Sequence, residues 1–474
     1  MIKRPLINPK YYLAILLVSV CFFCFHKLAL WDISDWDEAR NGVNAFEMLH
    51  NHDYFNLYYA HRLDTWNNKP PLFIWLIAVS YKIWGFNAFA LRFPSAIATV
   101  LFFAYFFKLV KLYQSELFAF TCSLILLSCK GILGFHVARN GDFDATLILF
   151  EIAAIYYFLS FLNGRNKNHI LFCGLFFGLA FWAKGTAFLL LIPGLILYLV
   201  FAGKIKTFLA QKGTWLSIGI FTFVTAAYFI LSFIYAKTFD SNQSFYHNKN
   251  AVETMLFNDT YQRFFDINFG NDKKPDYFYV FHNLDARFNI WNYVLYLTLI
   301  VILLIKLRRS NNPTKKIELP PLLSFSLILF LSIAAILTIS ADKKTWYLAP
   351  AIPFASIITG YGIFWFIQSY QKFKLLPAGL MVFLLFRHYS FLTSPFGDIN
   401  TFWDSQKESI KSADRIFIED YPSQSLHLLL LWTQKNVFYR GELSELPPHT
   451  IVVFKDNMQK DSVDCFRGDC FVMK

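Results

Sequence analysis

Charged residues are scarce in this chain of 474 residues. Asp, Glu, Lys and Arg make up 16% of it, whereas an average soluble domain carries roughly 25%. Hydrophobic residues make up 56%, and 56 residues are Phe. No soluble core needs so much apolar surface, so most of the chain must be solvated by lipid. The composition excludes an ordinary soluble domain.

Cysteine is also sparse, with seven residues. The first five lie in or beside apolar runs, where Cys is a small packing residue; they are Cys21, Cys24, Cys122, Cys129 and Cys173. Cys465 and Cys470 lie in a polar tail instead. They can pair as a disulfide if that tail is extracytoplasmic.

The net charge of +12 comes from short basic clusters between apolar runs. Such spacing is typical of membrane-topology signals and not of a nucleic-acid-binding face. The basic N-terminus and the apolar run after it resemble a signal peptide. That run is too long, however, and no small-residue cleavage site follows, so we interpret it as a retained first transmembrane helix.

The apolar runs predict eleven transmembrane spans. They lie at about residues 11–30, 89–107, 117–136, 145–162, 169–185, 186–203, 214–235, 291–305, 321–340, 347–368 and 375–392. The run at 70–86 is ambiguous, because it opens with two prolines, carries Lys82 and has only about 12 good apolar positions. We interpret it as interfacial or re-entrant.

The positive-inside rule then fixes the orientation. With the N-terminus inside and 70–86 not spanning, the basic clusters near residues 108, 165, 204, 308 and 372 all fall in the cytoplasm. The external face receives the segments 31–69, 136–144, 236–290, 341–346 and 393–474. Within the last, residues 415–419 and 450–454 read as strands and 425–434 as a helix. We therefore predict a membrane domain at 1–392 and a small external α/β domain at 393–474.

Two acids lie at the start of an amphipathic helix in the first external segment. A carboxylate in such a place can take the proton of a substrate hydroxyl or hold a metal ion at a leaving phosphate. Asp37 or Glu38 can do either. The alternative is that Asp35 and Glu38 merely cap the helix and favour its dipole.

Several external basic residues run against the positive-inside rule. Lys69 precedes Pro70-Pro71 at the start of a short helix, where ammonium and helix dipole together suit a phosphate, although it can also be a snorkelling interface lysine. Lys184 and the pair Lys343/Lys344 fall on the same side. One anionic lipid headgroup explains all of them together, whereas independent surface lysines need separate reasons.

The turn at 136–144 carries Arg139, Asp142 and Asp144 between two spans. Charges at the membrane edge are costly and often functional. The D-x-D pair also suits a divalent metal, although many such pairs are solvated turns.

The combined motifs resemble a known family. D-E-A-R at 37–40, K-P-P-L at 69–72, Arg139 with Asp144 five residues on, K-G at 184–185 and K-x-x-Y-L-x-P at 344–350 are similar in order and spacing to the aminoarabinose transferases that modify lipid A, and to their protein O-mannosyltransferase relatives. The resemblance covers about residues 10–370. The tail has no clear match, which leaves the acceptor open.

This resemblance implies an all-α polytopic GT-C fold and inverting transfer from a polyprenyl-phosphate-sugar. It implies that Asp37 is the catalytic carboxylate and Asp144 the second acid, with Glu38 beside them. It places the donor phosphate at Lys69 and Tyr347, with Lys184 and Arg139 as further basic groups. A divalent ion at Asp37 and Asp142 is the one cofactor the pattern allows.

We therefore expect a glycosyltransferase in a bacterial inner membrane with its active site on the periplasmic face. The acceptor is a lipid such as lipid A, a glycan or a protein; nucleic acid is not expected as a partner. The rival class is a multipass lipid or oligosaccharide transporter or flippase. Transporters often show repeated halves and polar groups near mid-membrane, whereas here no repeat is evident and the polar groups gather at one face.

Overall fold

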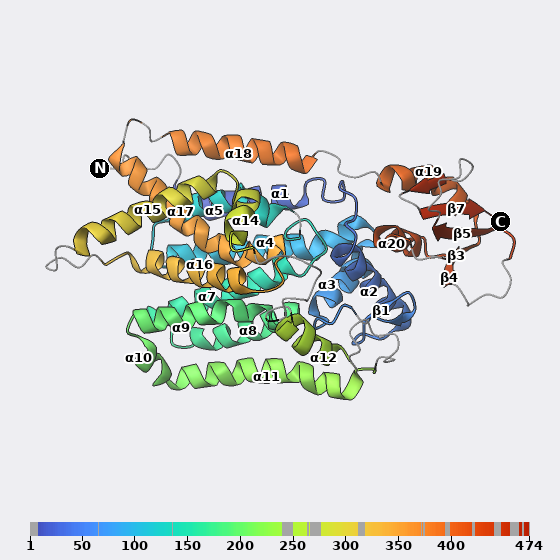
Figure 1. Cartoon of the computed structure of the whole chain (residues 1–474), viewed down its shortest axis with the longest axis horizontal. Helices are drawn as coiled ribbons and strands as arrows, with labels where there is room; N and C mark the ends of the chain where they lie inside the picture. The colour runs from blue at the N-terminus through green and yellow to red at the C-terminus, as the bar shows by residue number, and fades with distance from the viewer. Residues whose placement is uncertain are drawn as a thin grey trace.

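The computed structural model describes most of the chain. The residues described are 8–64, 66–134, 136–238, 250–262, 265, 276–310, 318–370, 372, 375–393, 399–419, 422–439, 447–455, 464–466 and 469–473. Two parts are visible along the long axis in Figure 1, a large helical body and a small sheet domain at the end opposite to the N-terminus.

A helix forms within each of the eleven predicted spans. They are α1 (Tyr12–Phe25), α4 (Ala88–Lys111), α5 (Glu116–Leu127), α7 (Asp144–Leu162), α8 (His169–Lys184), α9 (Ile192–Phe201), α11 (Lys212–Tyr235), α15 (Trp291–Ser310), α16 (Pro321–Ile339), α17 (Ile352–Ser369) and α18 (Leu376–Thr393). Several are shorter than the roughly 20 residues that cross a bilayer. Among the described residues, six helical runs are long and apolar enough to cross by themselves.

One of those six runs, residues 169–201, is two spans and not one. Lys184 at its middle lies 2.6 Å from Asp144, at the start of α7. Lys204 just beyond its end approaches the carbonyl of Leu162, at the other end of α7 (3.5 Å). The chain therefore reverses between α8 and α9. Gly185 permits the reversal, because its φ of +61° is one that side-chain-bearing residues rarely adopt.

Shorter elements connect the spans. They are η1 (Pro9–Tyr11), α2 (Asp37–Asn51), β1 (Tyr58–Tyr59), β2 (Arg62–Leu63), α3 (Leu72–Trp84), α6 (Lys130–Leu133), η2 (Gly185–Leu191), α10 (Ile205–Leu209), α12 (Ala251–Thr254), η3 (Met255–Gln262), α14 (Tyr279–Phe288) and η4 (Thr345–Ala351). In Figure 1, α2, α3 and β1 lie at the end of the body nearest the sheet domain, whereas α10 lies at the opposite end.

Helix α3 does not cross the body, as predicted for residues 70–86. The Lys69 ammonium just before it lies over the Phe143 ring, next to the start of α7 (5.4 Å). Tyr81 near its end contacts Trp432 of the sheet domain (6.2 Å between ring centroids). Both ends of α3 thus face the same side, which keeps the parity of all later spans.

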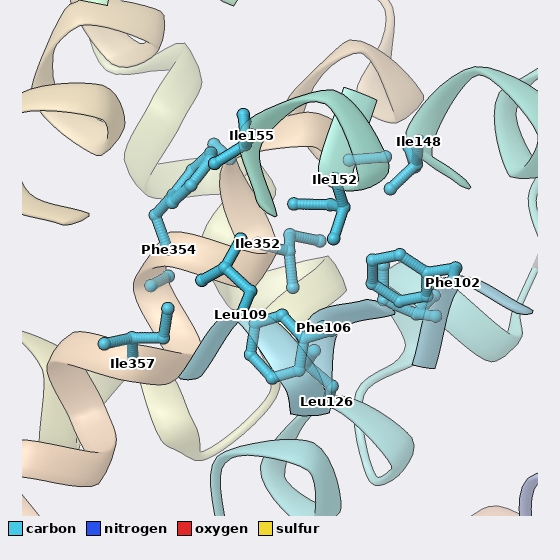
Figure 2. Close-up of a cluster of buried hydrophobic side chains, with 14 of the residues drawn as sticks. Phe102, Phe106, Leu109, Leu126, Ile148, Ile152, Ile155, Ile352, Phe354 and Ile357 are labelled. Atoms are coloured by element: carbon cyan, nitrogen blue, oxygen red, sulfur yellow. The ribbon is translucent and has the colours of Figure 1, made fainter. Parts of the chain in front are cut away.

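The core of the body lies where α4, α5, α7 and α17 meet. Figure 2 shows Phe102 and Phe106 of α4 facing Leu126 of α5, with isoleucines of α7 and α17 beside them. A Cβ on Gly360 would lie 2.5 Å from Cys122 Sγ, so glycine is what lets α17 approach α5 so closely. Helix α7 is buried along most of its length, as expected of a central helix that is apolar on all sides.

The tail forms the predicted α/β unit. It contains α19 (Ile399–Ser412), β3 (Arg415–Ile418), α20 (Gln424–Trp432), β4 (Asn436–Tyr439), β5 (Thr450–Lys455), β6 (Asp464–Phe466) and β7 (Asp469–Met473). The sheet order is β4-β3-β5-β7-β6, parallel around β3 and antiparallel beyond β5. Cys465 and Cys470 are directly opposite in register. Their disulfide, and the domain boundary at 392/393, stay predictions.

Candidate functional site

The site lies where α2 begins. Asp37 is the first residue of α2 and keeps 38% of its side-chain surface accessible. Its carboxylate lies 3.8 Å from Nδ1 of His136, which in turn lies 2.5 Å from the carboxylate of Asp142. The turn at 136–144 thus meets the first external helix, as the motifs predict.

The pKa of Asp37 is raised above its usual value. Burial of the carboxylate is the largest cause, and the nearby Asp142 carboxylate adds to it; Lys69 is the largest opposing influence. A carboxylate whose pKa moves toward neutrality is a better proton acceptor at physiological pH. The environment therefore suits Asp37 to the role of a general base.

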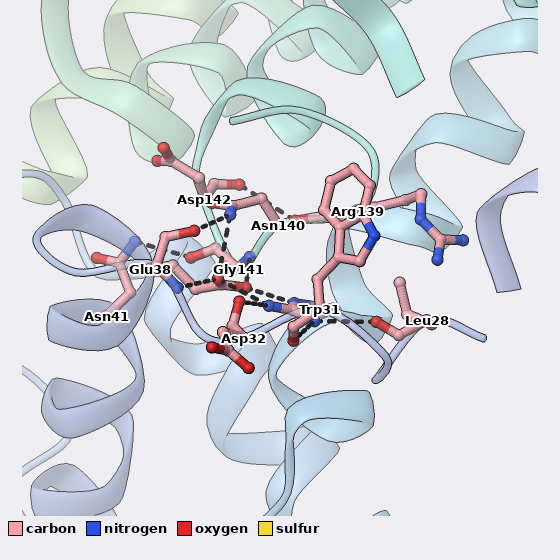
Figure 3. A network of polar contacts seen from close by, with 12 residues as sticks. Leu28, Trp31, Asp32, Glu38, Asn41, Arg139, Asn140, Gly141 and Asp142 are labelled. Atoms are coloured by element: carbon pink, nitrogen blue, oxygen red, sulfur yellow. Dashed lines mark hydrogen bonds and ion pairs between the residues drawn. The ribbon is translucent and has the colours of Figure 1, made fainter. Parts of the chain in front are cut away.

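Glu38 is predicted to be catalytic, but its contacts in the structure are with the protein itself. Its carboxylate is fully buried and forms a two-bond ion pair with Arg92 (2.6 and 3.0 Å). It also accepts hydrogen bonds from the backbone N–H groups of Ser34 and Gly141. Figure 3 shows it enclosed by the 139–142 turn. Glu38 therefore ties this turn to α2 and has no lone pair turned to a substrate.

Arg139 makes structural contacts, and its role as a phosphate ligand stays a prediction. Its guanidinium donates to backbone carbonyls at the end of α1 and just after it, at Phe23, His26 and Lys27 (2.8–2.9 Å). The side chain is buried and lies over the Trp31 ring. These bonds close the end of α1, while the buried Nε of Arg139 makes no hydrogen bond within the described part of the chain.

Lys184 and Asp144 form a buried ion pair of 2.6 Å. The last residue of α8 supplies the lysine, and the first residue of α7 supplies the acid. The structure therefore brings both predicted residues together. Asp144 lies only two residues after Asp142, the partner of His136.

A cavity of about 430 Å³ opens beside this pair and is amphipathic. Its polar lining includes Lys69, Lys184 and Tyr347, which are the predicted phosphate-site residues other than Arg139, together with Asp144, the predicted second acid. The rest of its lining is largely aliphatic and comes from α7, α9, η2 and α16: Leu147, Leu189, Leu190, Pro193, Ile336 and Leu337. A charged head at one end and a hydrocarbon chain at the other fit such a lining.

Two acids that sequence reasoning missed face the basic side chains of this cavity. Asp259 of η3 lies 3.8 Å from Lys69, and Asp342 lies 3.4 Å from the Tyr347 hydroxyl. Lys344 pairs with Asp342 and is largely exposed, and Lys343 is not part of the cavity lining. Single acids in long loops carry no spacing signal, so nothing in the sequence marked them.

His136 was also missed as a site residue, although it lies in the turn already singled out. Its ring stacks on Trp346 (3.8 Å between centroids). Its φ of +70° is positive, which is uncommon for residues other than glycine. An imidazole within a D-x-D turn is the signal that would have found it.

Asp37, His136 and Asp142 form the one cluster among the described residues with three metal-ligating side chains within 4.8 Å. Two carboxylates and an imidazole suit a divalent ion. Two ligands at right angles on such an ion lie about 3 Å apart, however, and His136 and Asp142 are only 2.5 Å apart. The donor types fit a metal, while the present spacing fits a hydrogen bond between the two.

Comparison with solved structures identifies the architecture. The chain superimposes on ArnT from Cupriavidus metallidurans bound to undecaprenyl phosphate with a TM-score of 0.69, 15% identity and 98% coverage of both chains. The apo form of that ArnT gives 0.64 at 14% identity, covering 91% of this chain and 86% of that one. The chain has a GT-C fold.

More distant comparisons agree with this fold. AglB from Archaeoglobus fulgidus, in complex with an inhibitory peptide and a dolichol-phosphate, gives a TM-score of 0.51 at 11% identity. The match covers 92% of this chain and 61% of AglB. Residues 68–231 match the family dolichyl-phosphate-mannose-protein mannosyltransferase. An uncharacterized protein of Aquifex aeolicus (strain VF5) is 23% identical over 349 residues, 73% of this chain but only 62% of that protein.

Proposed function

We propose that this GT-C protein is a membrane glycosyltransferase that transfers a sugar from a polyprenyl-phosphate to an acceptor hydroxyl. The amphipathic cavity carries the proposal. It sets Lys69, Lys184 and Tyr347 at one end of an aliphatic lining, next to Asp37. A polyprenyl-phosphate has the same division into an anionic head and a hydrocarbon tail. ArnT, whose fold this chain shares, has been crystallised with undecaprenyl phosphate.

The polar end of the cavity matches the needs of the leaving group. The two lysines supply positive charge, and the phenol of Tyr347 can donate a hydrogen bond. Negative charge grows on the phosphate as the sugar departs, so groups fixed in a dry cavity stabilise the transition state more than the ground state. Asp144 holds Lys184 in place through their ion pair.

The transfer needs no reactant other than the donor and the acceptor. Asp37 takes the proton of the acceptor hydroxyl, whose oxygen attacks the anomeric carbon. The bond from that carbon to the phosphate oxygen breaks, and polyprenyl phosphate leaves with the electron pair. Attack from the side opposite to the phosphate inverts the anomeric centre.

A divalent ion is a second, separate element of the proposal. Asp37 and Asp142 would hold it, with His136 as third ligand once the 2.5 Å contact widens. Bound there, it would supply electrostatic stabilisation to the departing phosphate. Thermal unfolding of the purified protein with Mg²⁺, Mn²⁺ or EDTA tests this independently of activity: a shift that Asp142→Asn abolishes supports the site, and equal melting curves reject it.

The test of function is a transfer assay in nanodiscs. Purified protein is incubated with undecaprenyl-phosphate-linked sugars and lipid, glycan or peptide acceptors, and released undecaprenyl phosphate is measured by mass spectrometry. We expect release that depends on acceptor and is at least about 10²-fold slower in Asp37→Asn, the cost of losing a general base. Movement of intact donor across liposomes without cleavage would support the flippase alternative instead.

The same proposal extends to location. The basic ends of the spans and the sheet domain lie at opposite ends of the body, so the site faces the side opposite to the basic loops. In a bacterium that side is the periplasmic face of the inner membrane.

A further inference from the structure

Two tryptophans stand at the outer rim of the site. Trp36 immediately precedes Asp37, and Trp66 lies three residues before Lys69. Their ring centroids are 6.0 Å apart with the planes at 49°. Trp36 is 61% exposed, although large aromatic side chains are usually well covered. The pair therefore lies next to both the proposed base and the proposed phosphate ligand.

Trp36 holds a backbone conformation that disfavours its own side chain. Its φ is +68° with ψ −109°, a region that bulky residues rarely occupy. Glycine would take this conformation without strain. Strain of this kind persists where the surroundings enforce it and concentrates at functional sites. A tryptophan at such a position implies that its ring has a use there.

The surroundings hold both tryptophans through one ion pair. Arg40 of α2 donates its backbone N–H to the carbonyl of Trp36 (2.9 Å). Its guanidinium makes two bonds to Asp64, at 2.8 and 2.6 Å. Asp64 is buried and in turn accepts the backbone N–H of Trp66 (2.8 Å). The Arg40–Asp64 pair thus fixes the two loops relative to each other.

The preceding residue fixes Trp36 from the other side. The carboxylate of Asp35 accepts hydrogen bonds from the backbone N–H and the hydroxyl of Ser425, at the start of α20 (2.8 and 2.7 Å). The backbone at Trp36 is therefore held on one side through Asp35 and on the other through its own carbonyl. A ring carried on a fixed backbone loses less entropy when a ligand binds it.

We propose that Trp36 and Trp66 form a binding platform for a pyranose ring of the acceptor, which makes the acceptor a carbohydrate or glycolipid. A pyranose presents an apolar C–H face that packs on an aromatic ring, while its hydroxyls stay in water. Trp36 adjoins Asp37 in the chain, and neither tryptophan is part of the lining of the donor cavity, which includes Lys184 and Tyr347. It would bring an acceptor hydroxyl to Asp37 from the outer side.

This inference rests on the proposed function for its role but has a test of its own. The probe is a lipid-anchored hexopyranose disaccharide, titrated into protein in nanodiscs by calorimetry without any donor. We expect wild-type protein to bind it and Trp36→Gly to weaken the dissociation constant about tenfold or more, since it removes a large aromatic contact. Trp36→Phe should retain most of the binding.

Stability provides the second readout. Trp36→Gly should raise the melting temperature, because glycine relieves the positive φ. If Trp36 were only an interfacial anchor, the same change would lower it and leave disaccharide affinity unaltered. The matched control is Trp84→Ala, which removes another exposed tryptophan (49%) from the end of α3 on the same side. This variant should keep the wild-type affinity for the disaccharide and should not raise the melting temperature.

The outcomes separate the two proposals. No disaccharide binding by wild type, or equal binding by Trp36→Gly, overturns the platform. Binding of a Ser/Thr peptide in its place, lost in Trp36→Gly, also overturns it and makes the acceptor a protein. Absence of donor cleavage in the transfer assay overturns the glycosyltransferase while leaving a Trp36-dependent affinity for the disaccharide intact.

Discussion

At the scale of single residues, the donor site depends on two side chains far apart in sequence. Lys69 precedes α3 and Tyr347 lies in η4, yet both line one cavity. Lys69→Ala and Tyr347→Phe should each weaken donor binding roughly tenfold or more, since a charge-assisted hydrogen bond contributes about 1.5–3 kcal/mol. The double variant should lose less than the sum if both bind one phosphate.

Donor affinity measured by titration with undecaprenyl-phosphate-sugar in nanodiscs checks this prediction. Lys82→Ala is the control, because that lysine lies on the same helix, is exposed and is outside the cavity. Unchanged affinity in both single variants would leave Lys184 as the remaining phosphate ligand.

Glu47 gives a prediction on pH at the same scale. Burial in α2 raises its pKa from the usual 4.5 to about 8, against the hydrogen bonds from the backbone N–H groups of His61 and Ala60. The folded protein therefore binds this proton more tightly than the unfolded one. Its stabilisation is complete below pH 4.5 and is lost as the pH rises toward 8.

Glu47→Gln should accordingly flatten the dependence of melting temperature on pH between about 5 and 8 and raise the value at pH 8. Glu408→Gln on the exposed face of α19 is the control and should change nothing. A melting curve of Glu47→Gln that still falls across this window would assign the dependence to another group.

Much of the site could be predicted at this scale because its parts are local motifs. Asp37 stands at a helix start, and Lys69 and Lys184 violate the charge rule for external loops. Glu38 and Arg139 carry the same chemistry, but Glu38 pairs with Arg92 and Arg139 bonds carbonyls at the end of α1. Those partners lie tens to more than a hundred residues away in the sequence, so local spacing could not separate structural from functional charges.

At the scale of elements, the sheet domain holds the helix that bears Asp37. Helix α20 packs along α2, and Asp35 caps its first turn. Gly42 allows the contact, because a Cβ there would lie 2.5 Å from Leu428. Gly42→Val should force α20 away and weaken docking.

Limited proteolysis checks this prediction, since undocking exposes α20, whose Leu428 is buried in the docked state, to protease. Ala39→Gly, a small-to-small change in the same helix, is the matched control for general loss of helix stability. Equal cleavage of Gly42→Val and wild type would mean that the domain stays docked without the close contact. This packing was not predictable, because α2 and α20 are separated by most of the chain.

At the scale of the whole molecule, the account requires that the basic loops and the sheet domain lie on opposite sides of the membrane. The positive-inside rule indicated that residues 70–86 do not span, and this decision fixed the direction of every later span. The structure agrees, because both ends of α3 lie on one side of the body. Hydrophobic runs therefore predicted where the helices lie, while their orientation in the membrane stays a prediction. Span lengths were less predictable, because α5 ends at Leu127 and the separate short helix α6 lies in its expected last part.

Accessibility labelling tests this topology. Glu408→Cys in α19 and Lys206→Cys in α10 are both exposed positions. An impermeant maleimide added to intact cells should label the first and not the second. The reverse pattern would invert the molecule and place the site in the cytoplasm.

The measurement that tests the central claim most directly is a structure of the protein with an undecaprenyl-phosphate-linked sugar bound. We predict the phosphate within hydrogen-bonding distance of Lys69 and Tyr347, the prenyl chain along Leu190 and Ile336, and the anomeric carbon turned toward Asp37. A donor bound outside this cavity, or one whose sugar points away from Asp37, would contradict the account.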